Sequence, residues 1–138
     1  MYDSMNYQPT LDHIVKAVRG MLSLLDSNGV LIFDMSTEYN SLEYFENNSS
    51  LLQYGQYQCK RESYYNKIEK KQMTNLTITD TNTGEIHIET HIQYMYPVKD
   101  IFEILRTSIE GNVAAYKDYS FEPLENNCER AHFYIEKT

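Results

Sequence analysis

A single carboxylate stands where α/β proteins commonly place a functional group. Asp34 ends the short apolar run Val30-Leu31-Ile32-Phe33, which follows the turn sequence Asp26-Ser27-Asn28-Gly29. Such a run is typical of a strand covered on both faces, as in a parallel sheet, and ligand sites gather at the carboxyl ends of parallel strands. Asp34 is therefore a candidate to bind or deprotonate a small molecule. The alternative is a structural role, in which its side chain caps the loop that follows.

A second group of side chains has the composition of a metal site. His87, Glu89 and His91 alternate along a predicted strand, so they share one face of it. A single strand closes a tetrahedral site poorly, so we interpret the three residues as a polar sheet face and expect no metal ion. The two cysteines, Cys59 and Cys128, form no CxxC pair. This argues against a structural zinc site and indicates free thiols in a reducing compartment.

The composition limits the classes of function. The chain has 138 residues, of which 41% are hydrophobic, and its net charge is −8. These values predict one domain with a packed core, and an acidic surface disfavours nucleic acid as a partner. No apolar stretch has the length of a signal peptide or a membrane span, so we expect a cytoplasmic protein with no membrane partner.

Apolar periodicity predicts two helices that would position these groups. Leu11, Ile14, Val18 and Leu22 recur at helical spacing after Thr10, which can cap the helix, and the pattern continues to about residue 25. A second helix is predicted from Pro97 to about residue 109.

Alternation of apolar and polar residues predicts the strands. Residues 35–53 are expected to be irregular, with a short helix only near 41–46, and the antiparallel meander is predicted at 54–65, 67–79 and 85–96. Its third strand should have one packed face, with Ile86, Ile88 and Ile92, and one wetter face. Two final strands are predicted at 113–121 and 130–135.

Taken in this order, the segments resemble the class I S-adenosylmethionine-dependent methyltransferases that act on small molecules. Tyr2-Asp3-Ser4-Met5-Asn6-Tyr7 resembles the loop after the fourth strand of that family, often of the form YDSxNY. Ser27–Asp34 is similar to the family's pGGxxiFD fifth strand, with Asn28 in place of the first glycine. The meander at 54–96 resembles an insertion that some members carry after this strand, and 97–138 resembles the last helix and the final antiparallel pair.

The resemblance implies a fold class and a set of site residues. The fold is expected to be α/β, the C-terminal half of a Rossmann-like methyltransferase domain with an antiparallel β-meander insertion. Residues 1–138 would form one partial domain, with the loop, helix and fifth strand in 1–34. In the sugar N-methyltransferases of the family, the loop positions that match Ser4 and Tyr7 face the acceptor. The resemblance therefore implies substrate-binding roles for Ser4 and Tyr7, beside that of Asp34.

The half of the family domain that binds the cofactor is not part of the resemblance. A Rossmann-like cofactor loop needs closely spaced glycines, and no two of the five glycines here are closer than nine residues. S-adenosylmethionine is therefore expected in the complete enzyme, with no cofactor-binding residue in this chain, which alone should be inactive. We expect a piece of a longer protein, a split or decayed gene product, or a half that needs a partner. The alternative is a non-catalytic binding or interaction module derived from a methyltransferase.

The same resemblance predicts an open sheet edge. In the family the fifth strand lies between the fourth and the seventh, so without the fourth strand residues 30–33 would have one unpaired side. Unpaired backbone groups on an apolar strand attract another strand. We therefore expect self-association, pairing with a chain that carries the N-terminal half, or an N-terminal segment that folds back over this edge. The acceptor is expected to be a small molecule, and N-, O- and C-methylation all remain open.

Overall fold

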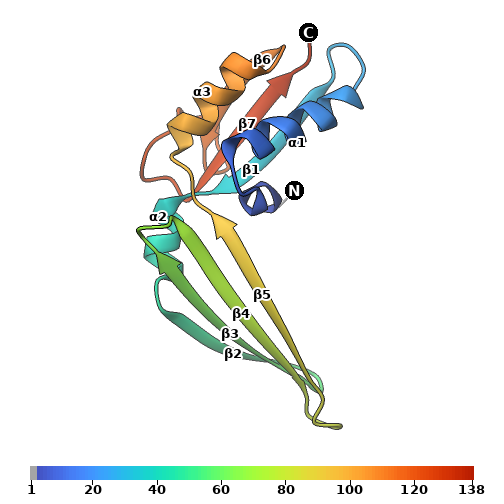
Figure 1. Ribbon diagram of the computed structural model, residues 1–138, viewed down its shortest axis with the longest axis vertical. Helices are drawn as coiled ribbons and strands as arrows, with labels where there is room; N and C mark the ends of the chain where they lie inside the picture. The colour runs from blue at the N-terminus through green and yellow to red at the C-terminus, as the bar shows by residue number, and fades with distance from the viewer. Residues whose placement is uncertain (1–2) are drawn as a thin grey trace. The chain divides into compact units, whose positions relative to one another are not determined.

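The computed structural model describes residues 3–138, so Tyr2 of the loop motif lies outside the described residues. The chain divides into two compact units. The first contains the residues up to Asn40 together with Tyr94–Thr138, and the second, Ser41–Gln93, is inserted between them (Figure 1). The mixture of helices and antiparallel sheets confirms the predicted α/β fold class with an antiparallel insertion.

The first unit is an antiparallel sheet with two helices on one face. The sheet has the strand order β1-β7-β6, formed by β1 (Val30–Ser36), β7 (Arg130–Glu136) and β6 (Asn112–Lys117). The helices α1 (Leu11–Ser23) and α3 (Val98–Ser108) pack against the same sheet face (Figure 1). The core between them contains Ile14, Val15, Val18, Leu22, Ile101, Leu105, Phe33, Met35, Ala131, Phe133 and Ile135.

Both predicted helices are confirmed. The Thr10 hydroxyl oxygen accepts a hydrogen bond from the His13 backbone N–H, which caps α1 as the sequence suggested. α1 ends at Ser23, two residues before the predicted end. Pro97 directly precedes α3, where its missing N–H leaves no hydrogen bond unmade.

The prediction that the first strand is covered on both faces is wrong. Phe33 and Met35 are buried against the helices, but Val30 and Ile32 on the opposite face are 40% and 60% exposed. β1 also pairs with β7 in an antiparallel ladder and lies at the edge of the sheet. A short apolar run shows that a strand is buried on at least one face, but its periodicity does not show whether the second face has a partner.

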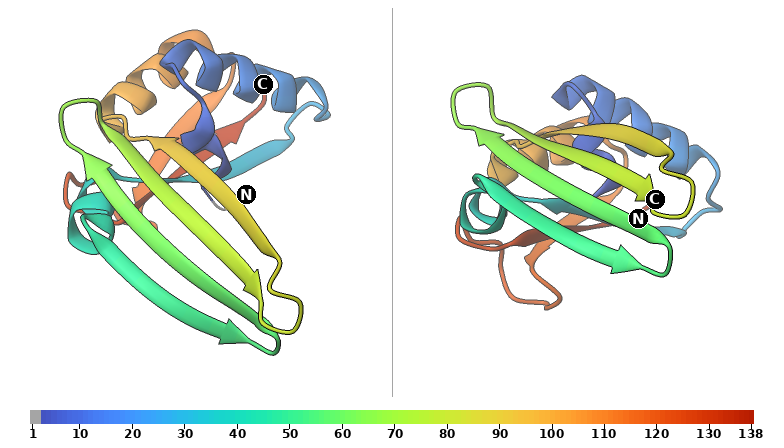
Figure 2. Two further views of the ribbon diagram at one scale, coloured as in Figure 1. Left: turned by 60° about the horizontal axis from the view of Figure 1, so that its bottom comes forward. Right: turned by 90° about the horizontal axis from the view of Figure 1, so that it is seen from below.

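The second unit is a four-stranded antiparallel sheet with the order β2-β3-β4-β5 (Figure 2). Its strands are β2 (Asn48–Tyr54), β3 (Tyr57–Asn66), β4 (Lys71–Asp80) and β5 (Ile86–Tyr94). The meander is therefore confirmed, but it begins at Asn48, inside the stretch predicted to be irregular. A short helix, α2 (Glu38–Asn40), and a single π-helical turn, η2 (Ser41–Phe45), precede it along the chain.

The alternation predicted for β5 is present, but its apolar face is not packed. Ile86, Ile88 and Ile92 are 60%, 67% and 39% exposed. On the opposite face Gln93 is buried, and its Oε1 accepts a hydrogen bond of 3.2 Å from Nε2 of Gln72. The side expected to be wetter therefore holds Gln93, the one buried residue of this strand.

Candidate functional site

Four residues of the YDSMNY motif form a short 3-10 helix beside the end of β1. This helix, η1 (Ser4–Tyr7), follows Asp3, whose backbone is left-handed with a φ of 52°. Asn6 is fully buried, and its Nδ2 donates to the Ser36 carbonyl at 3.0 Å while its Oδ1 accepts from the Ser36 N–H at 2.8 Å. The same Nδ2 lies 3.2 Å from the Tyr94 carbonyl oxygen. Asn6 therefore holds η1 against the end of β1 and against Tyr94, where the chain re-enters the first unit.

Asp34 lies in a buried ion-pair cluster. It is 8% exposed, as is Arg130 at the start of β7. Nη1 of Arg130 lies 2.5 Å from Oδ2 of Asp34 and 2.5 Å from Oδ1 of Asp3. Charge pairing of this kind offsets the desolvation of buried ions. The arrangement suits Asp34 to positioning the end of β1 and the start of η1 rather than to taking a proton from a ligand.

Two tyrosines at this end of the first unit keep their hydroxyl protons at neutral pH. Partial burial and, secondarily, the charge of Asp3 raise the pKa of Tyr7, which is 43% exposed. Partial burial and Tyr94 raise the pKa of Tyr96, whose hydroxyl donates to the Gln8 carbonyl at 2.8 Å. Both phenols are therefore hydrogen-bond donors, not phenolate bases.

A hollow of about 260 Å³ lies between the segment that follows β1 and the start of α3. It is lined by Thr37, Glu38, Tyr39, Tyr96, Pro97, Val98, Lys99, Asp100 and Asn126. Tyr96 links this hollow to η1, because its hydroxyl binds the carbonyl of the residue after Tyr7. Carboxylate, ammonium, phenol and amide groups together suit a small polar molecule.

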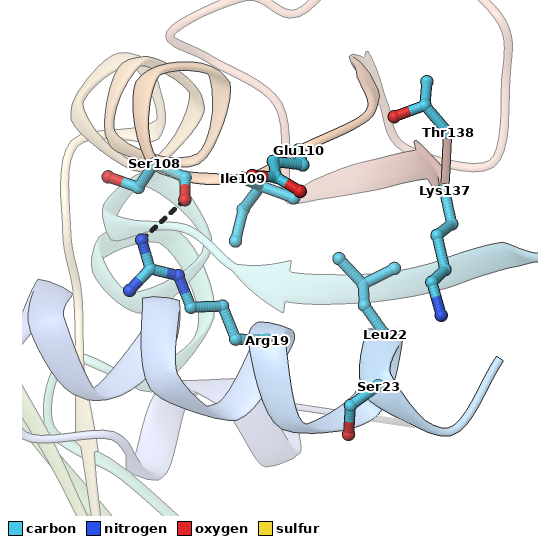
Figure 3. Close-up of a pocket in the computed structure, with 8 residues that line it drawn as sticks. All are labelled: Arg19, Leu22, Ser23, Ser108, Ile109, Glu110, Lys137 and Thr138. Carbon is cyan, nitrogen blue, oxygen red and sulfur yellow. Dashed lines mark hydrogen bonds between the residues drawn. The ribbon is translucent and has the colours of Figure 1, made fainter.

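A second hollow, of about 320 Å³, lies between the C-terminal parts of α1 and α3 (Figure 3). Its two cationic side chains bind backbone carbonyls at the ends of these helices. Nη2 of Arg19 donates to the Ser108 carbonyl at 2.7 Å, at the end of α3. The Lys137 ammonium, also drawn in Figure 3, donates to the Leu25 carbonyl after α1. Cations at helix C-termini satisfy carbonyls that have no partner inside the helix. We therefore assign these two side chains a structural role.

The structure brings the predicted residues to one end of the first unit, with one important addition. Ser4 and Tyr7 lie on η1, and Asp34 is connected to the start of η1 through Arg130 and Asp3. Arg130 was missed from the sequence. The sequence offered one indication, which is that Arg130 is a charged residue at the start of a largely apolar predicted strand. A charge buried in this way needs a partner of opposite charge. The roles of Ser4, Tyr7 and Asp34 toward a ligand remain predictions.

Neither a metal site nor a membrane span is found in the described part of the chain. Within residues 3–138, no group of three His, Cys, Asp or Glu side chains is placed to hold a metal ion. His87 and His91 each lie near Glu89, with Nε2 to carboxylate oxygen distances of 3.1 and 3.2 Å. Among the same residues, none of the helices has the length and hydropathy needed to span a bilayer.

Comparison with known proteins identifies the fold. No protein-family model matches the sequence, and no curated protein matches it. The chain is similar in structure to an S-adenosylmethionine-dependent methyltransferase from Clostridium acetobutylicum, with a TM-score of 0.79, 21% identity, and coverage of 99% of this chain and 55% of that one. The sugar N-methyltransferase KedS8 from Streptoalloteichus gives a TM-score of 0.70 at 15% identity, over 99% of this chain and 53% of that one.

A third similar structure was solved with S-adenosylmethionine bound. It is CalS10, an amino pentose methyltransferase from Micromonospora echinaspora, with a TM-score of 0.65, 13% identity, and coverage of 100% of this chain and 56% of that one. The chain thus spans about half the length of the structures it matches. At these identities the likeness establishes the fold alone, which matches about half of each of these methyltransferases.

Proposed function

We propose that this chain is the acceptor-binding part of an S-adenosylmethionine-dependent methyltransferase that acts on a small molecule. The main support is that nearly the whole chain has the fold of about half of such an enzyme. The YDSMNY motif adds support, because its described residues, 3–7, lie at the end of β1, where η1 is held by Asn6. We assign this chain to the part that follows the cofactor-binding half.

Ser4 and Tyr7 are the residues that we assign to the acceptor. Methyl transfer is an in-line displacement, so the protein has mainly to orient the nucleophile and exclude water. Tyr7 keeps its proton and is partly exposed, so it can donate a hydrogen bond to an acceptor oxygen or nitrogen. Ser4 is exposed on the same short helix. Asp34 contributes by holding Arg130, and through it Asp3, beside them.

The residues of this chain do not fit the cofactor. Gly20 lies within α1, Gly55 and Gly84 lie in the hairpin turns, and Gly29 and Gly111 lie in tight turns before β1 and β6. None of them forms the closely spaced glycine loop that lets a backbone approach such a ligand. We therefore assign S-adenosylmethionine to a cofactor-binding half.

The edge of β1 is where we place that cofactor-binding half. β7 occupies one side of β1, and Asn6 satisfies the backbone of Ser36 on the other. The rest of that edge carries exposed apolar side chains at Val30 and Ile32. An apolar edge strand of this kind favours addition of a further strand.

Acceptor binding can be tested on the chain by nuclear magnetic resonance. Amide shifts of the labelled chain are followed while amino sugars and other small hydroxyl and amino compounds are added. Amino sugars come first because two similar structures are a sugar N-methyltransferase and an amino pentose methyltransferase. Saturable shifts are expected at Ser4 and Tyr7, and Tyr7→Phe should weaken binding by about tenfold through one lost hydrogen bond. The matched control is Tyr119→Phe, because Tyr119 is 78% exposed elsewhere in the first unit.

The assignment of the cofactor to another half is tested by calorimetry. The chain alone should not bind S-adenosylmethionine with micromolar affinity. Tight binding would show that the chain has a cofactor site outside the glycine-loop pattern. Acceptor shifts that are absent throughout the panel, or unchanged by Tyr7→Phe, would instead favour a non-catalytic interaction module.

A further inference from the structure

An apolar hollow adjoins the hollow of about 260 Å³ that Tyr96 lines, which we call the polar hollow. The apolar hollow has a volume of about 200 Å³. The linings of the two have three residues in common, which are Val98, Lys99 and Asn126. The rest of the apolar lining consists of Phe102, Ala115 and Leu124. All of these residues belong to the first unit, so one ligand can reach both hollows.

Three parts of the first unit form the apolar hollow. Val98 and Phe102 are four residues apart on α3, so they share a face of this helix. α3 packs beside β6, which carries Ala115 (Figure 1). Leu124 lies on the segment between β6 and β7. Val98 is 9% exposed, and the other three side chains are partly buried against the hydrophobic core. The walls of this hollow are thus part of the packed fold.

The segment that carries Leu124 is anchored on both sides of this residue. Nζ of Lys117 lies 2.8 Å from Oε2 of Glu122 and 3.1 Å from Oε1 of Glu125. The Lys117 backbone N–H also donates to the Glu122 carbonyl at 3.1 Å. A wall that is already formed lowers the cost of ordering side chains when a ligand binds.

Ala115 leaves room for an apolar group. It is the smallest side chain in the lining, and it lies between α3 and the segment that carries Leu124. An apolar cavity of about 150 Å³ is large enough to hold benzene. The apolar hollow, at about 200 Å³, can therefore take one six-membered ring.

The polar hollow favours a cationic group. Glu38 and Asp100 supply two carboxylates to its lining, against the single ammonium of Lys99. The Tyr96 hydroxyl donates to the Gln8 carbonyl at 2.8 Å, so its oxygen can still accept a hydrogen bond from a ligand N–H. A protonated amine matches both the charge of this hollow and its hydrogen-bond acceptor.

We propose that the two hollows form one site for a small amine that carries an apolar ring. The amine lies in the polar hollow, and the ring lies among Phe102, Ala115 and Leu124. The ring distinguishes this class of ligand from simple amino and hydroxyl compounds. The role of this ligand as the methyl acceptor rests on the proposed function, whereas its binding does not.

Three probes separate the ring from the amine. 2-Phenylethylamine has both groups, ethylamine lacks the ring and 2-phenylethanol lacks the amine. In a nuclear magnetic resonance titration, 2-phenylethylamine should give saturable amide shifts at Tyr96 and Lys99 and also at Phe102 and Ala115. Ethylamine should bind at least about tenfold more weakly, because it buries no ring. 2-Phenylethanol should bind about two- to fivefold more weakly, because it carries no charge.

The apolar hollow is tested by filling it. Ala115→Leu should weaken the binding of 2-phenylethylamine at least about tenfold, because the added side chain takes the place of the ring. Ala114→Leu is the matched control and should leave binding unchanged. Ala114 is the preceding residue of β6 and is also half-buried, but its side chain points to the opposite face of the sheet.

Circular dichroism checks that both alanine variants fold. If Ala115→Leu does not fold, Leu124→Ala is measured in its place. It removes one wall of the apolar hollow and should weaken the binding of 2-phenylethylamine about threefold or more. Unchanged binding in this variant would contradict the proposal.

The polar hollow is tested by removing one charge. Asp100→Asn should weaken the binding of 2-phenylethylamine about two- to fivefold and leave that of 2-phenylethanol unchanged. Asp12→Asn is the matched control, because Asp12 is likewise exposed in the first turn of a helix, α1. It should change the binding of neither probe.

Several results would overturn the proposal. They are the absence of saturable shifts from 2-phenylethylamine at the two hollows, binding of ethylamine that is equally tight, and equal effects of Ala115→Leu and Ala114→Leu. Amino-sugar shifts at Ser4 and Tyr7 without shifts from 2-phenylethylamine would overturn this site and leave the proposed function. Binding of 2-phenylethylamine at both hollows, with no compound shifting Ser4 or Tyr7, would support this site and count against the proposed function.

Discussion

The carboxamide of Asn6 pairs with both backbone groups of Ser36, at 2.8 and 3.0 Å, in the way that the backbone of a neighbouring strand would. Asn6 is fully buried and Ser36 is nearly so. One amide side chain thus supplies the donor and the acceptor that the end of this edge strand lacks. It also explains why the motif that contains Asn6 forms a defined 3-10 helix.

Asn6→Ala should destabilise the first unit substantially. It leaves the N–H and C=O of Ser36 buried without these partners, and each unsatisfied group costs about 1–3 kcal/mol. Urea unfolding should therefore show a loss of about 2–4 kcal/mol in the free energy of unfolding. Asn127→Ala is the control, because Asn127 is exposed, and it should change stability little. Equal effects of the two substitutions would contradict the role of Asn6.

Arg130→Met should be more damaging than Asp34→Asn/Arg130→Met. The single change leaves the buried Asp34 carboxylate without Arg130 and should cost about 3–5 kcal/mol. The double change removes both charges, so the double variant should lose less unfolding free energy than Arg130→Met alone. A double-mutant cycle, which also needs Asp34→Asn, measures the coupling. Arg19→Met removes an exposed arginine that caps a helix carbonyl and should cost about 1 kcal/mol or less. An additive cycle would show that Arg130 and Asp34 are not coupled.

Two glycines should respond to alanine in opposite directions. Gly111 has a φ of 145°, and a Cβ there would collide with the Glu136 carbonyl oxygen. Gly111→Ala should therefore lower stability by about 2 kcal/mol or more. Gly20 lies in α1 with nothing within 4 Å of an added Cβ, so Gly20→Ala should raise stability by about 0.5–1 kcal/mol. Thermal or urea unfolding measures both, and a stabilising Gly111→Ala would exclude the collision.

Cys128 should lower stability at high pH. Burial and, secondarily, the charge of Asp118 raise the pKa of its thiol above the ordinary value. The folded state therefore favours the protonated thiol, and its contribution is complete below the unfolded pKa of about 8.5 and is lost as pH rises through the folded pKa. The decline in unfolding free energy between neutral and alkaline pH should be smaller in Cys128→Ala than in the parent.

Alkylation checks the same thiol directly. In the folded chain Cys59, which is partly exposed, should react first, and Cys128, which is 3% exposed, should react at least about tenfold more slowly. Peptide mapping after iodoacetamide treatment separates the two. Equal labelling at neutral pH would contradict the burial of Cys128.

The sequence was informative where one short-range pattern controls the structure. Helical spacing and a capping threonine were sufficient to place α1 and α3 closely, because each helix buries one apolar stripe. The antiparallel meander was recognisable from alternation and turn residues. β2 was missed because most of its residues are exposed on both faces, so it shows no alternation of burial. Its strand conformation depends on the ladder with β3.

The parts of the site that depend on long-range contacts could not be predicted. Asp34 and Arg130 are 96 positions apart, and no local pattern connects them. The same holds for Asn6, which belongs to the YDSMNY motif but could not be recognised as the partner of Ser36. Ile88 shows a second limit of the sequence. Alternation predicts that its face of β5 is packed, but the Ile88 side chain is exposed. Periodicity shows which residues share a face, not what covers it.

The chain leaves the first unit after Asn40 and re-enters it at Tyr94. Asn6 binds the backbone shortly before the exit, at Ser36, and again at the return, at Tyr94. Both junctions are thus anchored by a side chain that belongs to neither β1 nor β5. Loop closure grows costlier only slowly with length, so residues 41–93 can be lengthened, shortened or replaced as a cassette while the junctions stay fixed. Exchange of residues 41–93 for another segment, in nature or by design, would change the second unit and leave the hydrophobic core of the first unit in place.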